Sequence, residues 1–446
     1  MPNQAILAID IGSSSVRAAL YDYDARPLKG LAARREWSFA STPTGGSEMD
    51  AVAPFRVVCA AIDEVLAKAF DPNIYITHVA ICLFWHSLMG VNAQGKPTTP
   101  VLGWADTRSG KYSAELKKKF NEHDVHNRTG AHFHSSFWPA KLLWLRSEMP
   151  EVFQRTAKWM GFGDHVAERL TGNAVTSVSM ASATGLFDQR RCDWDDKLLR
   201  YLKIEKKLLP DVTASTASFP FARTTVKRWP QLKNAVLFPP IGDGAADHVG
   251  SCGIGKKKAS LMVGTSAAMR VAYKGEPPNE IPSGLWCYRI DDERVILGGA
   301  LSDGGNLYDW CRRTFRLTKN VEDDIRHRDP TRALPTILPF FHGERSTGYR
   351  EGARGAILDL LSSHDGVDIL HAAMIAVAQR LADINERLRL VAPFEQVVAS
   401  GGALRRSPLW CEMISTMLGK DLEISPSNES ALRGVVLLAL ERIKAQ

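Results

Sequence analysis

The sequence has no run of about 18 uninterrupted apolar residues, so it encodes no membrane-spanning helix. Its seven cysteines are an odd number without a C-x-x-C pair, which excludes a disulfide framework and a zinc ribbon. The net charge of +7 comes from basic residues spread along the chain rather than gathered in a stripe. We therefore expect partners other than nucleic acid or a membrane, and an anionic small substrate would explain the positive excess.

The amino-terminal residues do not form a secretory signal. Met1–Ile9 lacks a basic region, and the chain reaches an acid at Asp10 after only a few apolar residues. Hydrophobic residues at 45% and charged residues at 24% are typical of a globular protein, and 446 residues predict two or three domains. We expect a cytoplasmic protein with a large core.

The apolar pattern occurs twice along the chain. In the first half the pattern predicts a hairpin of two strands over Ala5–Asp22, a third strand over Leu31–Phe39, a helix over Pro54–Phe70 and a strand over Ile76–Phe84. The predicted order is β-β-β-α-β. The second half predicts strands and helices over Ala259–Tyr273, Val295–Leu301, Gly304–Arg313, Ile369–Val391, Gln396–Ser400, Ser407–Leu418 and Glu429–Lys444. Because the turn at Ile11–Ser14 has the same chemistry as the turn at Val263–Ser266, we infer an internal duplication. We place the boundary near residue 250, after an irregular, proline-containing stretch at Ser215–Pro240.

Two of the predicted turns offer hydroxyl and backbone N–H donors. In the first, Asp10 ends a strand beside Gly12–Ser15, which suits a magnesium-bound phosphate and equally suits an ordinary hairpin turn. In the second, Gly264–Ala267 has the same donors, but Met262 stands where the acid would be. One half would then hold a metal and the other would bind phosphate.

Two further turns are rich in glycine. Ser400–Ala403 lies between a strand and a helix, where glycine lets a flat ligand approach the backbone, although a plain loop is the common alternative. In the other turn Asp243 stands between two glycines, so it can approach a substrate and is the best candidate for a general base. Asp247, four residues later, could face solvent on the next helical turn.

Four runs follow one another in this order along the chain: AIDIGSSSVRAALYD, GDGAADHVGSCG, VGTSAAMRV and ASGGALRRSPLW. Through these runs the chain resembles the FGGY carbohydrate kinases from Ala5 to about Leu440. The resemblance implies an α/β fold of two actin-like ATPase (ribonuclease-H-like) domains with an interdomain active-site cleft. By this resemblance residues 1–250 would supply the substrate site, the magnesium site and a phosphate turn, and residues 251–446 would bind the nucleotide. The same resemblance accounts for the duplication.

The family resemblance also implies residue roles. Asp10 would be the magnesium-associated acid and Asp243 the catalytic base. The implied contacts with ATP are Ser13, Ser14, Ser15, Gly264, Thr265, Ser266, Gly305, Gly401, Gly402, Ala403 and Arg406. The implied substrate contacts are Trp85, His86, Trp104, Asp106, Ser136 and Gly244, with Arg108 as the candidate cation for a carboxylate.

The segments HSLMGVNAQGKPTTPVLGWADTRSG and FHGERSTGYREGARGAI look most like the gluconokinase branch of the family, although xylulokinases share much of the pattern. The resemblance therefore implies ATP- and Mg²⁺-dependent phosphorylation of a terminal hydroxyl on a sugar acid or ketose, with D-gluconate converted to 6-phosphogluconate as the leading expectation. The alternatives are a xylulokinase-type kinase of a pentulose or other polyol, and a non-catalytic nucleotide-dependent binding protein of the actin-like fold. Family habit suggests a homodimer.

Overall fold

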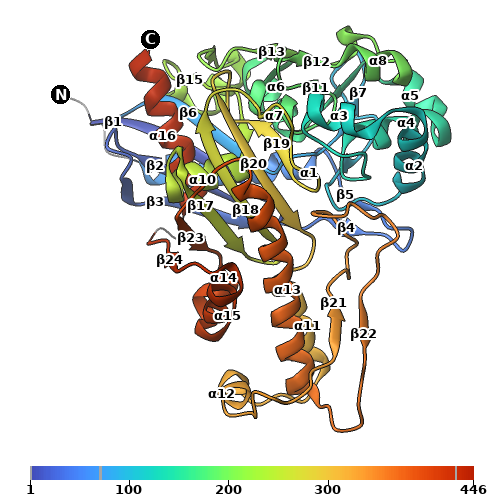
Figure 1. Cartoon of the computed structure of the whole chain (residues 1–446). Helices are drawn as coiled ribbons and strands as arrows, with labels where there is room; N and C mark the ends of the chain where they lie inside the picture. The colour runs from blue at the N-terminus through green and yellow to red at the C-terminus, as the bar shows by residue number, and fades with distance from the viewer. Residues whose placement is uncertain (1–2, 70–72, 427–428, 446) are drawn as a thin grey trace.

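The computed structural model describes residues 3–69, 73–426 and 429–445, and these are arranged on two large mixed β-sheets (Figure 1). The first sheet has the order β14-β15-β6-β1-β2-β3, and β16 also pairs with β6. Its strands are β1 (Asn3–Ile11), β2 (Ser15–Tyr21), β3 (Pro27–Glu36), β6 (Ile74–Leu83), β14 (Phe219–Pro220), β15 (Val236–Leu237) and β16 (Ile241–Gly242). The second sheet has the order β19-β20-β18-β17-β23-β24. Its strands are β17 (Gly255–Val263), β18 (Ala267–Lys274), β19 (Trp286–Arg289), β20 (Arg294–Leu301), β23 (Gln396–Ser400) and β24 (Leu422–Ile424).

The two sheets repeat one arrangement. Strand β1 is antiparallel to β2 and parallel to β6, and β17 is likewise antiparallel to β18 and parallel to β23. In each half a helix precedes the parallel strand: α1 (Ala53–Lys68) before β6 and α13 (Gly366–Arg389) before β23. The predicted β-β-β-α-β order of the first half is confirmed, and so is the repeated hairpin of the second half.

Burial explains why the central strands are so apolar. Residues 5–9 and Ile11 of β1 are fully buried, because helices or the other half of the chain cover both faces of the sheet. Asp10 interrupts this run near the end of the strand and is itself only 2% exposed. A buried carboxylate in a central strand is costly, so its position already marks a place of chemical interest.

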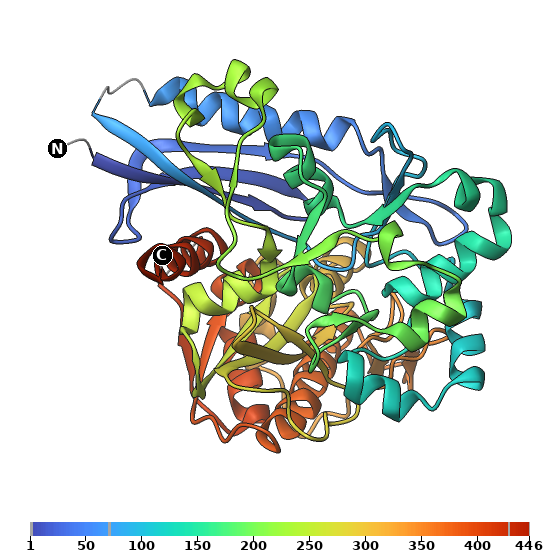
Figure 2. The same cartoon turned by 90° about the horizontal axis from the view of Figure 1, so that it is seen from above.

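Helices α10 (Asp243–Cys252) and α16 (Ser430–Ala445) cross between the two sheets, as Figure 2 shows. The crossing is a backbone contact, since a Cβ atom added at Gly250 would lie 1.8 Å from the Ser430 carbonyl oxygen. A Cβ atom at Gly434 would lie equally close to the Ala246 carbonyl oxygen. This tight crossing holds α10, which begins with Asp243, in a constant place relative to both sheets.

Residues 86–240 form an extension of the first half with a hydrophobic cluster of its own, around Trp138 and Trp159. Its helices are α2 (Gly110–Lys119), α3 (Glu122–Thr129), α4 (Trp138–Glu148), α5 (Pro150–Arg155), α6 (Phe162–Thr171), α7 (Val178–Ser182), α8 (Asp196–Leu202) and α9 (Arg223–Arg228). Its short strands are β7 (Met89–Val91), β8 (Val101–Leu102), β9 (Lys158–Met160), β10 (Val175–Ser177), β11 (Phe187–Asp188), β12 (Asp193–Trp194) and β13 (Asp211–Thr213). The stretch 215–240, expected to be irregular, contains β14 and β15, which pair in the first sheet. Strands of two residues are too short to show a periodic pattern.

The remaining elements flank the two sheets. They are β4 (Ala40–Ser41), β5 (Ser47–Met49), α11 (Gly305–Thr314), α12 (Val321–Arg326), β21 (Thr336–Leu338), β22 (Ala356–Leu358), α14 (Gly402–Arg406) and α15 (Pro408–Leu418). Figure 1 shows α12, β21 and β22 extending away from the second sheet beside α13. None of the helices in the described part of the chain is long and apolar enough to span a membrane.

Candidate active site

A cavity of about 180 Å³ lies between the two halves of the chain. The first half lines it with Ser13, Phe84, Trp85, His86, Trp104 and Asp243. The second half lines it with Met262, Ser266, Ala267, Ala268, Arg270, Trp286, Tyr288, Ala300 and Arg345. The structure thus brings six of the residues singled out from the sequence to one place: the acid at position 243, three substrate positions and one serine from each hairpin turn.

Asp243 is the acidic residue that lines this cavity. It is the first residue of α10, and its Oδ1 accepts a hydrogen bond of 2.7 Å from the Gly244 backbone N–H. Burial raises the pKa of Asp243 above its usual value, and the Arg270 guanidinium opposes that rise. A carboxylate beside a cation, at the start of a helix, can accept a proton from a substrate hydroxyl.

The glycines beside Asp243 have a packing role that the sequence did not reveal. A Cβ atom at Gly242 would lie 1.8 Å from the Trp85 ring, and one at Gly244 would lie 2.6 Å from it. The expectation was that glycine leaves the acid without steric cover. The structure shows instead that the Trp85 indole occupies this space, with its Nε1–H donating to the Ser179 carbonyl oxygen at 3.1 Å. The ring therefore forms the cavity wall next to the acid.

His86 has an unusual backbone and a defined tautomer. Its φ of 69° is in the left-handed region, which residues other than glycine seldom adopt. Burial lowers the pKa of His86 well below its usual value, so the ring is neutral. Because Nδ1 lies 2.7 Å from the Ala183 carbonyl oxygen, Nδ1 carries the hydrogen and Nε2 is the acceptor. Nε2 then accepts from Nη2 of Arg345 at 3.4 Å.

Asp10 lies at the end of β1, next to the first hairpin turn. Its Oδ2 is 2.7 Å from Nη2 of Arg17, and its Oδ1 accepts from the Cys82 thiol at 3.6 Å. Burial raises the pKa of Asp10 to about 6, with Arg17 opposing the rise and the charge of Asp243 adding to it. Mg²⁺ in kinases is usually held by one or two carboxylates together with waters and substrate phosphates, so this acid, near a second acid and the Ser13 turn, fits such an ion.

A second, smaller hollow lies near the second hairpin turn, where Gly305 approaches the Gly264 carbonyl oxygen. It is lined by Gly305, Tyr308, Asp309, Ala403, Arg406, Ser407 and Trp410. Three of these residues, at positions 305, 403 and 406, were expected to contact the nucleotide. Gly401 has a φ of 100°, and a Cβ atom there would lie 2.2 Å from the Val263 carbonyl oxygen, so only glycine fits this close approach to β17.

The other predicted ATP contacts lie at or near the same turns without lining either hollow. Ser14, Thr265 and Gly402 are exposed, Ser15 is buried at the start of β2, and Gly264 and Gly401 are half-buried. The carbonyl oxygen of Thr265 accepts from the backbone N–H groups of Gly304 and Asn306, both at 3.1 Å, which ties the second turn to the start of α11.

Four predicted substrate residues lie outside the cavity lining: Asp106, Arg108, Ser136 and Gly244. Nη2 of Arg108 is 2.5 Å from a carboxylate oxygen of Asp106 and 2.5 Å from one of Glu48. Its guanidinium also lies 4.8 Å from the centre of the Trp144 ring. Arg108 therefore already has two counter-ions, and it is not free to hold a substrate carboxylate as the sequence suggested.

Apart from Ser266, the residues that the second half places in the cavity were not expected from the sequence to have a role there. Nε of Arg270, Nε of Arg345 and the Tyr288 hydroxyl are all buried and lack a hydrogen-bond partner among the described residues. Arg270 and Arg345 stand inside segments that carry the family resemblance, so those segments were a signal that could have been followed. Nothing in the spacing of Tyr288 pointed to the site.

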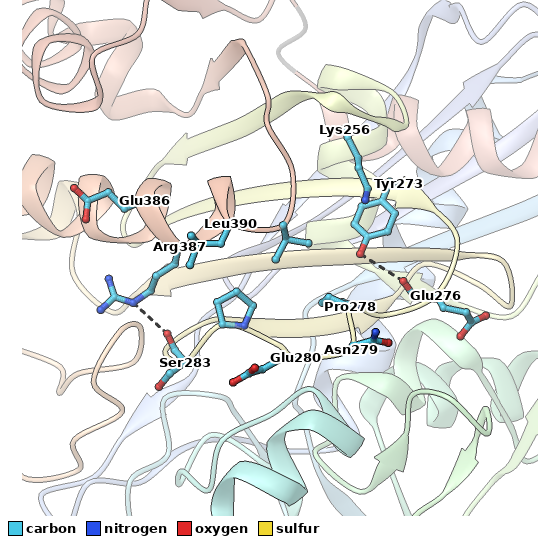
Figure 3. A pocket seen from close by; sticks show the side chains of 12 residues that line it. Lys256, Tyr273, Glu276, Pro278, Asn279, Glu280, Ser283, Glu386, Arg387 and Leu390 are labelled. Carbon is cyan, nitrogen blue, oxygen red and sulfur yellow. Dashed lines mark hydrogen bonds between the residues drawn. The ribbon is translucent and has the colours of Figure 1, made fainter.

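A larger hollow of about 1000 Å³ lies elsewhere, and Figure 3 shows that it is an open surface groove between the loop at 276–283 and the end of α13. Two of its polar groups are paired: Nε of Arg387 donates to the Ser283 carbonyl oxygen at 3.1 Å, and the Tyr273 hydroxyl donates to the Glu276 carbonyl oxygen at 3.4 Å. None of the predicted site residues lines it. The cavity that contains Asp243, with its unpaired donors and its half-buried acid, is the better candidate.

Comparisons with known proteins agree with this geometry. Residues 5–248 match the N-terminal domain, and residues 259–441 the C-terminal domain, of the FGGY family of carbohydrate kinases. The chain is 25% identical to a gluconokinase of Bacillus subtilis, over 98% of this chain and 87% of that protein. It is 20% identical to a xylulose kinase of Staphylococcus xylosus, over 97% of this chain and 90% of that protein. The crystal structure of a gluconate kinase from Lactobacillus acidophilus superimposes with a TM-score of 0.90 at 24% identity, covering 100% of this chain and 90% of that one. The expected α/β fold of actin-like ATPase type is confirmed.

Proposed function

The chain belongs to the FGGY family of carbohydrate kinases, and from that premise we propose that it phosphorylates D-gluconate at its 6-hydroxyl. As a carbohydrate kinase it is an ATP-dependent phosphotransferase. In the proposed reaction the bond between the γ-phosphorus and the β-γ bridging oxygen breaks, and a bond forms between that phosphorus and O6 of the sugar acid. The O6 proton passes to Asp243, and ADP leaves.

One observation carries the proposal: the half-buried Asp243 and the serines of both hairpin turns line the same small cavity. The carboxylate of Asp243 accepts the proton late, because the transition state of phosphoryl transfer is loose and needs little early activation of the nucleophile. Ser13 and Ser266 enter the cavity from opposite halves, where they can donate hydrogen bonds to the transferred phosphoryl group. Asp10 would hold Mg²⁺, whose charge offsets that of the phosphates.

The cavity favours a sugar acid over a neutral sugar. Arg270 and Arg345 both line it, and each is at least nine-tenths buried. Arg270 is paired with Asp247, but Arg345 has no carboxylate partner among the described residues. A pentulose has no negative charge to set against the Arg345 guanidinium, whereas gluconate has a carboxylate. The similarity to the Bacillus subtilis gluconokinase supports the same choice. The similarity to a xylulose kinase makes a pentulose the second candidate.

Three wider expectations are part of the same proposal. We divide the chain into a domain of residues 1–250 and one of residues 251–446, because the sheet arrangement occurs twice and α10 connects the two copies. The homodimer and the cytoplasmic location stay predictions from family habit and from the sequence.

The test is ADP release by the purified protein with ATP and Mg²⁺ against gluconate, xylulose, ribulose, glycerol and erythritol. Gluconate should give the highest kcat/KM, and omitting Mg²⁺ should abolish the signal. A signal with xylulose alone would move the substrate to the pentulose. No signal with any sugar, from protein that melts cooperatively and binds ATP, would contradict the proposed reaction.

The matched pair Asp243→Asn and Asp247→Asn tests the base. Asp243 lines the cavity, whereas Asp247, one helical turn later, pairs with Arg270 at 3.4 Å and accepts from the Ser430 hydroxyl at 2.5 Å. Asp243→Asn should lower kcat by about 10²- to 10⁴-fold with little change in the KM for ATP. Asp247→Asn should lower kcat by about tenfold or less, because it would change only the position of Arg270. If the two losses were equal or reversed, Asp243 would not be the base.

A further inference from the structure

Arg345 is a buried cation without a counter-ion. It lies in the segment between β21 and β22, is 9% exposed, and lines the cavity that contains Asp243. Within the described residues no carboxylate forms an ion pair with it, and its Nε has no hydrogen-bond partner. Burying an unpaired charge is expensive, so an arginine in this state indicates an anion that arrives with the ligand.

Neutral groups hold the Arg345 side chain in place. Nη2 donates to Nε2 of His86 at 3.4 Å, and the guanidinium carbon lies 5.1 Å from the centre of the Trp104 ring. The neutral imidazole accepts one hydrogen bond, and the indole face attracts the cation without neutralising it. Both residues thus orient the guanidinium plane and leave the Nε edge free for a planar, two-oxygen acceptor.

The other two arginines near the site are already paired. Arg108 is bound by Asp106 and Glu48, as described above. Arg270 pairs with Asp247 at 3.4 Å, and its Nε lies 3.2 Å from where a Cβ atom of Gly244 would be, so it belongs to the end of the cavity where Asp243 begins α10. Arg345 lies instead with His86 and Trp104. The charge of Arg345 also lowers the pKa of Asp243, but its direct contacts are with His86 and Trp104, and no ion pair joins it to Asp243.

We propose that Arg345 binds the carboxylate of the sugar acid and makes the enzyme selective for aldonates over neutral polyols and ketoses. This assignment rests on the proposed function, because it names the contact that orients the acid so that its far hydroxyl reaches Asp243. His86 and Trp104 act as positioning residues for the guanidinium. The ligand chemistry is a carboxylate on a polyhydroxylated chain of about six carbons.

The test compares D-gluconate with D-glucitol, which has a hydroxymethyl group in place of the carboxylate. Dissociation constants of both are measured by calorimetry for the wild type, Arg345→Gln and Arg345→Lys, together with ADP release from gluconate. Arg345→Gln should weaken gluconate binding by about 30- to 100-fold and change glucitol binding by less than about threefold. Arg345→Lys should give an intermediate loss, because the charge remains without the planar fork.

Each outcome separates this assignment from the proposed function. Equal weakening of both ligands, or unchanged gluconate binding by a variant that melts like the wild type, would overturn the role of Arg345 while leaving the kinase reaction intact. Wild type that binds gluconate through Arg345 but releases no ADP with it would support the carboxylate subsite and contradict gluconate as substrate. Wild type that binds gluconate no more tightly than glucitol would overturn the subsite.

Discussion

The hairpins β1–β2 and β17–β18 occupy equivalent places in the two sheets but differ in turn length and in chemistry. In the first, Asp10 pairs across the ladder with Arg17, and in the second Met262 pairs with Ala268. Each turn has a backbone hydrogen bond of 2.9 Å, but the Gly12 N–H donates to Ser15, three residues later, whereas the Gly264 N–H donates to Ser266, two residues later. Both turns thus have serine hydroxyls and backbone N–H donors, while only the first hairpin has the acid.

The arginines of the two hairpins show how the halves became dependent on each other. Arg17, on β2, pairs with Asp10 of its own hairpin. Arg270, on β18, reaches Asp247 of α10 instead and offsets the charge of Asp243. The first half therefore supplies Asp10 and Asp243, and the second half supplies a cation that opposes the rise in the pKa of Asp243. Neither half alone has a complete site.

The largest effect should come from removing the acid that only the first hairpin has. Asp10→Asn keeps the shape of the side chain but loses the charge that would hold Mg²⁺, so kcat should fall by about 10³-fold or more. Met262→Leu is the substitution at the matching position of the second hairpin. It nearly conserves the side-chain volume and should lower kcat by less than about threefold. Steady-state ADP release at saturating Mg²⁺ measures both, and similar losses would mean that the two hairpins are chemically equivalent.

A smaller effect should follow from removing the cation that the second hairpin supplies. Because Arg270 lowers the pKa of Asp243 against the effect of burial, Arg270→Gln should raise that pKa. The base acts only when ionised, so activity falls as the pH falls through its pKa. The acid limb of the kcat/KM profile should therefore move to higher pH by about one unit. An unmoved limb in a variant of normal melting temperature would show that Arg270 does not act on Asp243.

The smallest effect should come from a hydroxyl in the second turn. Thr265 is exposed there, and its backbone oxygen, not its side chain, ties the turn to α11. Thr265→Ala should raise the KM for ATP by about two- to tenfold, the value of one neutral hydrogen bond, and leave the fold intact. Thr265→Ser is the control and should restore the KM. An equal increase in both variants would indicate that the methyl group, rather than the hydroxyl, is what matters.

Much of the fold followed from local pattern. The apolar runs around Asp10 and Met262 predicted both hairpins, and long periodic stretches such as Ile369–Val391 predicted helices to within a few residues of α13. The same reasoning missed β14 and β15, and the extension at 86–240 was not assigned elements, because short strands and helices depend on neighbours that are distant in the sequence.

The sequence by itself determined which residues carry charge and hydroxyl groups, and it predicted a common site for Asp243, His86 and Trp104, which line one cavity in the structure. Only the tertiary structure decided which arginine is free. Arg108 and Arg345 are the same residue type in segments that both looked functional, but one meets two carboxylates in the fold and the other meets an imidazole and an indole. Whether two side chains pair depends on their distance in space, which the sequence does not give. Arg345 and His86, for example, are 259 positions apart in the sequence but in contact in the fold.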